Sequence, residues 1–176
     1  MFKPTVLLAT ASLLTFAACG SDDEMTSTAP GAALKCTSSG KNAFATYGAA
    51  AFVAVNKAIF AEVNAELTAN ATSNLGNSFS TVNDFPRFEG RLAAFLVYVY
   101  GGPSKITYTD GKEYDGMQDM EQAHAGLGIT SAQYDYFVAS IIVPALTKSG
   151  VPMGDVSSCF APIVLDASVK ASIVGQ

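Results

Sequence analysis

The residue with the widest chemical range in this sequence is His124, which is the only histidine in 176 residues. Imidazole is the commonest side-chain metal ligand when it is neutral, and it also serves as a general acid or base. His124 lies in the stretch Gln122-Ala-His-Ala-Gly-Leu-Gly-Ile-Thr130, whose glycines mark the exit from a short helix over about 120–124. A lone histidine with no chemical role, in a core or on a surface, is the common alternative. Any function of this chain that needs an imidazole must use His124.

Composition excludes several classes of function. The length fits one domain, and apolar residues make up 49% of the chain, which is enough for a sizeable core. Ten Lys and Arg face 15 Asp and Glu, giving a net charge of −5. No basic run or basic-aromatic stripe is present, which argues against nucleic-acid binding. No reductase domain, flavin fingerprint or output domain is visible, so an electron donor or signalling partner would be another protein.

The first residues have the pattern of a targeting segment. Lys3 is followed by a mostly apolar run over 6–18 that is too short for a comfortable membrane span. The run ends in Phe16-Ala-Ala-Cys19, which looks like a bacterial lipobox, in which the cysteine thiol is lipidated. An ordinary secreted protein cut near Ala18 is the alternative. We therefore expect a signal peptide over 1–18, a lipidated Cys19 with a flexible tether over 19–40, and a folded domain over 41–176.

This interpretation predicts a protein in the bacterial cell envelope, with the lipid on the periplasmic or outer surface as its one membrane contact. It leaves two cysteines, Cys36 and Cys159, once Cys19 is lipidated. Such a pair in an oxidising compartment forms a disulfide or remains as two buried thiols. A disulfide between them would stabilise the fold by about 4 to 5 kcal/mol in the chain-entropy model. No CxxC motif or Cys/His cluster indicates zinc or redox exchange.

Apolar spacing predicts helices along the rest of the chain. We expect a helix over 42–69, broken near Gly48, with Phe52, Val55, Ile59, Val63 and Leu67 on one face. A polar loop follows over 70–83, in which Leu75 and Phe79 return to the core.

The next helix is expected to start at Asp84 as N-cap and to run to Tyr100, where Gly101-Gly102-Pro103 ends it. A polar segment over 104–115 contains a turn at 108–111. After the short helix of His124, Thr130-Ser-Ala-Gln133 is a capping-box signature.

The helix that starts at Thr130 should kink at Pro144 and end near Gly150. A last helix over about 155–173 should be interrupted at Pro162. No strand alternation is convincing, so the fold class is all-α.

The order of these features over about 47–174 resembles a truncated haemoglobin, the two-over-two globin family, and its first group most of all. Three blocks carry the resemblance: Ala94-Phe-Leu with Gly101-Gly-Pro103; Tyr114-Asp-Gly with Asp119-Met-Glu-Gln-Ala-His-Ala-Gly-Leu-Gly-Ile-Thr130; and Gly150-Val-Pro152 with Ala161-Pro162. The middle block is specific because it joins the proximal-histidine helix to the family's exit into the next helix. The sequence departs from the family at Gly48-Ala49, where a double glycine is usual, and one extra residue precedes His124.

The resemblance implies haem b (iron protoporphyrin IX), with His124 as the iron ligand through Nε2 and the Met120 carbonyl as acceptor for the other ring nitrogen. Arg91 falls where the family often has a basic residue that reaches a haem propionate, although a solvated surface arginine is equally consistent. The remaining residues expected to contact haem could also be ordinary core residues, because core and haem wall overlap in a globin. They are Phe79, Phe95, Leu96, Ile129, Tyr134, Phe137 and Ile141.

The distal side implied by the resemblance lacks the family's usual polar groups. The alignment puts Phe60 where a tyrosine commonly binds O₂, Leu92 where a glutamine is common, and Phe88 one turn before it. Tyr98 and Tyr100 share the helix of Leu92, but their helical phase points them elsewhere. Without a hydrogen-bond donor O₂ should dissociate quickly, whereas CO and NO should be affected less.

We therefore expect a haem protein that binds a diatomic gas, O₂, NO or CO, rather than an enzyme with assigned catalytic residues. The first alternative is a haem-dependent redox enzyme that detoxifies NO or reactive oxygen with an external reductase. The second is a haemless globin-fold module with a structural or interaction role. The single histidine argues against peroxidase chemistry, which needs a distal acid-base group.

Overall fold

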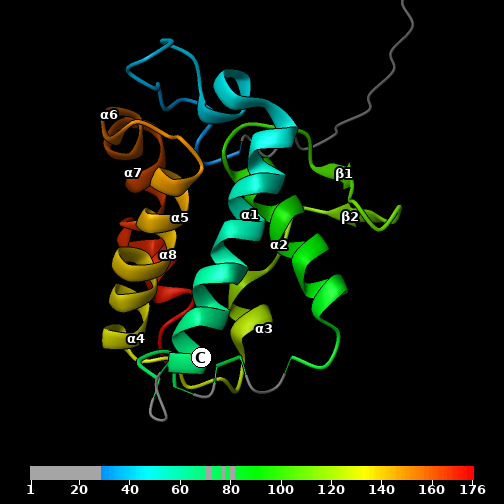
Figure 1. Ribbon diagram of the computed structural model, residues 1–176, viewed down its shortest axis with the longest axis vertical. Helices are drawn as coiled ribbons and strands as arrows, with labels where there is room; N and C mark the ends of the chain where they lie inside the picture. Colours follow the sequence, from blue (N-terminus) through cyan, green and yellow to red (C-terminus); the bar gives the residue numbers. More distant parts are fainter. Residues whose placement is uncertain (1–28, 70–72, 77, 80–81) are drawn as a thin grey trace, which may run out of the picture.

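The structure, a computed structural model, describes residues 29–69, 73–76, 78–79 and 82–176, and this part of the chain is mostly helical (Figure 1). The all-α expectation is confirmed at this level. The expected signal peptide over 1–18 and the lipidation site Cys19 lie outside the described residues.

The longest element is α1 (Ala43–Ala69), which packs against α2 (Phe85–Val99) and also against the later helix α5 (Val143–Lys148) (Figure 1). Gly48 interrupts it with φ 74° and ψ 169°, a conformation that favours glycine, so the predicted break is confirmed. By length and composition α1 could cross a membrane. Its apolar stripe is nevertheless part of the core, since Phe52, Ile59 and Val63 are buried.

The ends of α2 follow the sequence prediction. Asp84 Oδ1 accepts a hydrogen bond from Arg87 N at 3.1 Å and so caps the first turn. Gly101 ends the helix with φ 92°. Between these ends, Ala93 and Ala94 are fully buried.

A small β-hairpin corrects the expectation that no strands are present. Strands β1 (Lys105–Thr107) and β2 (Glu113–Asp115) pair antiparallel, with Ile106 opposite Tyr114. Each strand has only three residues, of which one points inward. Such a strand is too short for an alternation of apolar and polar residues to be visible in the sequence. The turn predicted at 108–111 is present, because Gly111 N donates to Tyr108 O at 2.9 Å.

The second half of the fold begins with the short helix α3 (Met120–His124), as predicted. A nearly continuous helix follows from α4 (Ser131–Tyr136) through the π-helical segment η1 (Phe137–Ile142) into α5. The capping box is confirmed: Gln133 N donates to Thr130 Oγ1 at 3.2 Å, and Thr130 N donates to Gln133 Oε1 at 2.8 Å. Pro144 lies in the first turn of α5 and follows the wider π-helical turns, while the backbone on both sides stays right-handed helical.

The C-terminal helix is interrupted in a different place from the one predicted. The helices α6 (Met153–Asp155), η2 (Val156–Phe160) and α7 (Ala161–Val164) follow directly on one another, and α8 (Ala167–Ala171) starts anew. Pro162 occupies the first turn of α7, where its missing N–H costs little. The break comes at Leu165–Asp166, and Asp166 caps α8 with its side chain.

Residues 29–40 form a fixed arm rather than the flexible tether expected for them. Gly31 N donates to Val99 O at 2.7 Å, and Cys36 forms a disulfide with Cys159. Thr37 Oγ1 donates to Asp155 Oδ1 at 2.8 Å. The folded body therefore begins no later than Ala29, and only residues before it remain as a candidate tether.

Candidate functional site

His124 is positioned by the short helix α3. Asp119 Oδ1 caps this helix by accepting from Gln122 N at 3.1 Å, and the chain leaves it at Ala125, whose φ is −55° and ψ is 129°. His124 Nδ1 lies 2.8 Å from the carbonyl oxygen of Met120. A carbonyl only accepts hydrogen bonds, so this contact places a proton on Nδ1. In the neutral tautomer with this proton, Nε2 carries the lone pair.

The imidazole of His124 is half-buried, and within the described part of the chain its Nε2 has no hydrogen-bond partner. An oriented neutral imidazole with an available Nε2 is what a single axial metal ligand requires.

Four of the predicted contact residues form an aromatic chain that links α1, α2, the loop before α2, and η1. The ring centroids of Phe60 and Phe88 lie 5.2 Å apart in an edge-to-face arrangement. Phe79 lies 6.2 Å from Phe88 and 6.1 Å from Phe137. Through these ring contacts the structure connects Phe60 with Phe137, which are 77 positions apart in the sequence.

Burial divides the predicted contact residues into three groups. Tyr134 and Ile141 are buried, and Arg91 is exposed. The largest group is apolar and only half-buried, unlike the fully buried core: Phe60, Phe79, Phe88, Leu92, Phe95, Leu96, Met120, Ile129 and Phe137. Contiguous apolar patches, rather than single accessible side chains, mark ligand-binding surfaces, and the ring contacts above join four of these residues into one cluster.

Not every predicted residue is directed toward such a surface. The hydroxyl of Tyr134 donates to the carbonyl of Val164 at 2.7 Å, so its polar end is used within the fold. Tyr100 donates to the Phe160 carbonyl at 3.1 Å, and burial raises its pKa well above the ordinary value. Tyr100 thus points away from Leu92, as its helical phase predicts.

A cavity of about 460 Å³ lies beside α3. Phe95 and Met120 line it, and both belong to the predicted contact set. Tyr98, Met117 and Val169 also line it, and sequence reasoning did not single these out for this role. Met117 is 55% exposed in the structure. The available sequence signal was only that a methionine stands close to the histidine segment.

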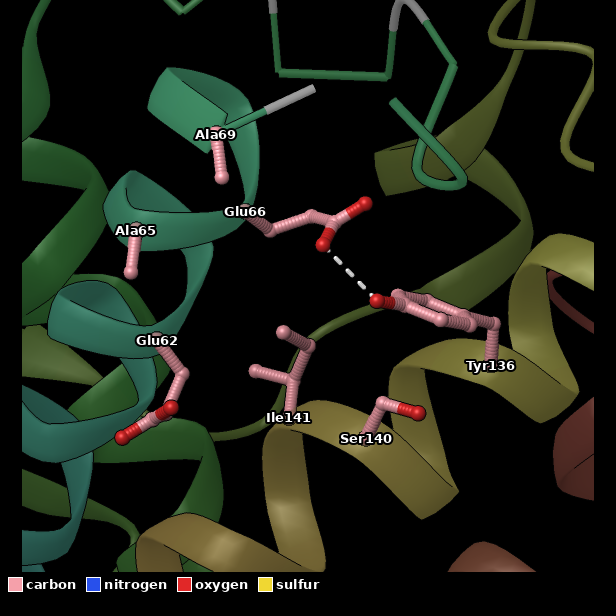
Figure 2. A pocket seen from close by; sticks show the side chains of 7 residues that line it. All are labelled: Glu62, Ala65, Glu66, Ala69, Tyr136, Ser140 and Ile141. Atoms are coloured by element: carbon pink, nitrogen blue, oxygen red, sulfur yellow. Dashed lines mark hydrogen bonds between the residues drawn. The ribbon is translucent and has the colours of Figure 1, made fainter. Parts of the chain in front are cut away.

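A second cavity, of about 230 Å³, lies between α1 and η1 and reaches Ile141 (Figure 2). Its carboxylates already have partners: Tyr136 donates to Glu66 Oε2 at 2.7 Å, which raises the tyrosine pKa, and Glu62 lies 2.5 Å from Lys148 Nζ. Among the described residues no group of three or more His, Cys, Asp or Glu side chains could hold a metal ion.

Comparison with known proteins adds no assignment, because no family model and no curated protein matches this chain.

Proposed function

We propose that this protein binds haem b through His124 Nε2 in a two-over-two globin fold and uses it to bind a diatomic gas. The observation that carries the proposal is the 2.8 Å contact between His124 Nδ1 and the Met120 carbonyl, which orients the imidazole and leaves Nε2 without a hydrogen-bond partner among the described residues. Haem, when bound, would supply an iron that binds the His124 imidazole and a diatomic gas, O₂, NO or CO.

Features of the described residues support the choice of this group. A porphyrin needs one oriented axial donor and wide apolar contact, and the half-buried phenylalanine and leucine side chains supply that contact. The aromatic chain through Phe60, Phe88, Phe79 and Phe137 presents ring edges and faces from four separate segments. The exposed Arg91 guanidinium is available to a propionate at the surface.

An apolar distal wall determines the ligand preference in this proposal. Phe60 and Phe88 pack edge to face, and neither carries a polar atom. Bound O₂ depends on a donated hydrogen bond more than CO or NO do, so we expect rapid O₂ dissociation and relatively strong CO and NO binding. His124 and Met120 orient the group, and the phenylalanines exclude water from it.

We place the protein in the cell envelope, attached through lipid on Cys19. Support comes from the Cys36–Cys159 disulfide, because disulfides persist in oxidising compartments such as the periplasm or cell surface. An external reductase would be the partner that returns the iron to its ferrous state.

The test is a haem titration of the chain from Gly20 onward, which contains the whole described body. We expect one haem per chain and a ferrous spectrum that shifts cleanly with CO. His124→Ala should abolish stoichiometric binding, whereas Gln122→Ala, an exposed change in the same helix, should preserve it. A normal haem spectrum in His124→Ala would refute the ligand assignment, and no haem uptake by the unsubstituted chain would leave a haemless helical module.

A further inference from the structure

The cavity beside α3 touches the residue that orients His124. Met120 lines the cavity together with residues 116–119, and the carbonyl oxygen of Met120 lies 2.8 Å from His124 Nδ1. A molecule in this cavity would therefore contact the same short helix that sets the direction of the imidazole. None of the aromatic chain residues Phe60, Phe79, Phe88 and Phe137 lines it.

The cavity wall combines residues 116–120 with three other parts of the fold. Helix α2 contributes Phe95 and Val99, the C-terminal region contributes Ile163 and Val169, and the arm contributes Pro30. A volume of about 460 Å³ lies within the range of about 300–1,000 Å³ that is typical of small-molecule sites.

The segment that carries Met117 is held firmly against α2. Gly116 N donates to Ser104 O at 2.6 Å, and a Cβ at Gly116 would lie only 2.3 Å from Ala94 O. The wall on this side is therefore backbone packed on backbone. A ligand can displace the side chains of Met117 and Met120 more easily than their main chain.

The charges at the cavity favour a neutral occupant. Asp119 is the one charged residue in the lining, and Asp115 and Glu121 are exposed close to it in the chain. Lys170, which follows the lining residue Val169 in the chain, lies 2.6 Å from Asp135 and is thus paired. An anionic amphiphile such as a fatty-acid carboxylate would be repelled by the Asp119 carboxylate in the lining, whereas an uncharged apolar molecule would not.

We propose that this cavity binds a neutral apolar small molecule and that its occupancy regulates the His124 site through Met120. The regulatory half rests on the proposed haem function, and the binding half does not. Methionine side chains suit such a site because they are flexible and polarisable.

The test uses methionine methyl NMR with decan-1-ol as the neutral probe and decanoate as the anionic one. The chain from Gly20, labelled with ¹³C at its methionine methyl groups, is loaded with haem and kept in the diamagnetic ferrous CO form. Met117 and Met120 are the reporters. Met153 is the matched control, because it is 56% exposed against 55% for Met117 but does not line the cavity.

We expect decan-1-ol to shift the Met117 and Met120 signals saturably, to leave Met153 unchanged, and to bind more tightly than decanoate. Val169→Trp, which fills the cavity, should abolish the shifts, whereas Leu165→Trp at an exposed position outside the cavity should not. Parallel shifts of Met153 would mean adsorption to the surface and would overturn the proposal. Loss of decan-1-ol binding on haem uptake would also overturn it, because the cavity would then be part of the haem site.

Regulation is read from the iron–histidine vibration of the ferrous protein without CO. We expect decan-1-ol to change its frequency, and saturable binding with no such change would refute the regulatory half. If the chain takes up no haem, the proposed function and the regulatory half fail together. The methionine shifts of the haem-free chain would still decide whether the cavity binds the probe.

Discussion

Removing the disulfide should reduce stability through the unfolded chain rather than through lost contacts. Cys36 and Cys159 are 123 positions apart, so the bond closes most of the described body into one loop. The chain-entropy relation for a loop of that length gives about 5 kcal/mol at 25 °C. For a domain of this size, such a loss corresponds to roughly 10–20 °C in the melting temperature.

The arm has a second attachment that should preserve the native structure of the variant. Ser38 N donates to Asp155 Oδ1 at 2.9 Å, Thr37 bonds the same oxygen, and the hydroxyls of Ser38 and Tyr47 donate to Asp155 Oδ2. These contacts do not depend on the sulfur bridge. We therefore expect Cys36→Ala/Cys159→Ala to keep the far-ultraviolet circular dichroism spectrum and the haem stoichiometry of the parent.

The assay is urea unfolding of the parent, both single variants and the double variant. Each single variant already lacks the disulfide, so the free energy of unfolding should fall by a similar amount in all three variants. The m-values of the variants should exceed that of the cross-linked parent, because the unfolded state of the parent is more compact. A double variant that loses the sum of the two single losses would assign the effect to packing of the buried sulfurs. A loss below about 1 kcal/mol would refute the loop-entropy reasoning altogether.

Three further changes test the distal wall, the buried carboxylate and a helix cap. Phe60→Tyr should slow O₂ dissociation about 10- to 100-fold, as expected for a hydrogen bond of about 1.5–3 kcal/mol to a polarised ligand. Stopped-flow measurement of the O₂ dissociation rate, with Phe60→Leu as the control, checks this. Equal rates in the two variants would show that residue 60 does not face the ligand. Hydrogen bonds from Ser38 and Tyr47 hold the pKa of the Asp155 carboxyl well below its ordinary 3.8. The stability that this carboxylate contributes is therefore present above that ordinary value and is lost as the pH falls below it. Urea midpoints measured from about pH 6 to about pH 3 should fall less in Asp155→Asn than in the parent, and parallel profiles would contradict this. Thr130→Ala removes the capping hydroxyl of α4 and should cost about 1 kcal/mol, with Thr130→Ser nearly neutral in the same unfolding assay.

Local chemistry explains which parts of the fold were predictable. Asp84, Gly101 and the Thr130 capping box act through bonds within one turn, so their sequence patterns identify the helix ends. The same locality holds for His124 and Met120, which are one helical turn apart.

The features that were missed depend on partners far away in the chain. The arm looked like a tether because its polar composition is typical of linkers, yet its bonds go to Val99 and Asp155. The place of the C-terminal break was wrong because Pro162 is tolerated in a first turn, whereas Asp166 caps the next helix. The cavity beside α3 is lined by residues from the arm, α2 and the C-terminal region, and no local sequence pattern predicts that these distant segments lie together.

The path of mechanical tension through the molecule follows from the link between the arm and η2. A force that pulls on the chain ahead of Ala29 reaches Cys36 and passes through the sulfur bridge to Cys159, so it bypasses the 123-position loop between them. Helices α1 and α2, which carry Phe60 and Phe88, lie inside that shielded loop. In a protein held to a surface by its N-terminus, covalent tension would then pass from Cys36 directly to Cys159, and the backbone loop that contains His124 would not be stretched along its length.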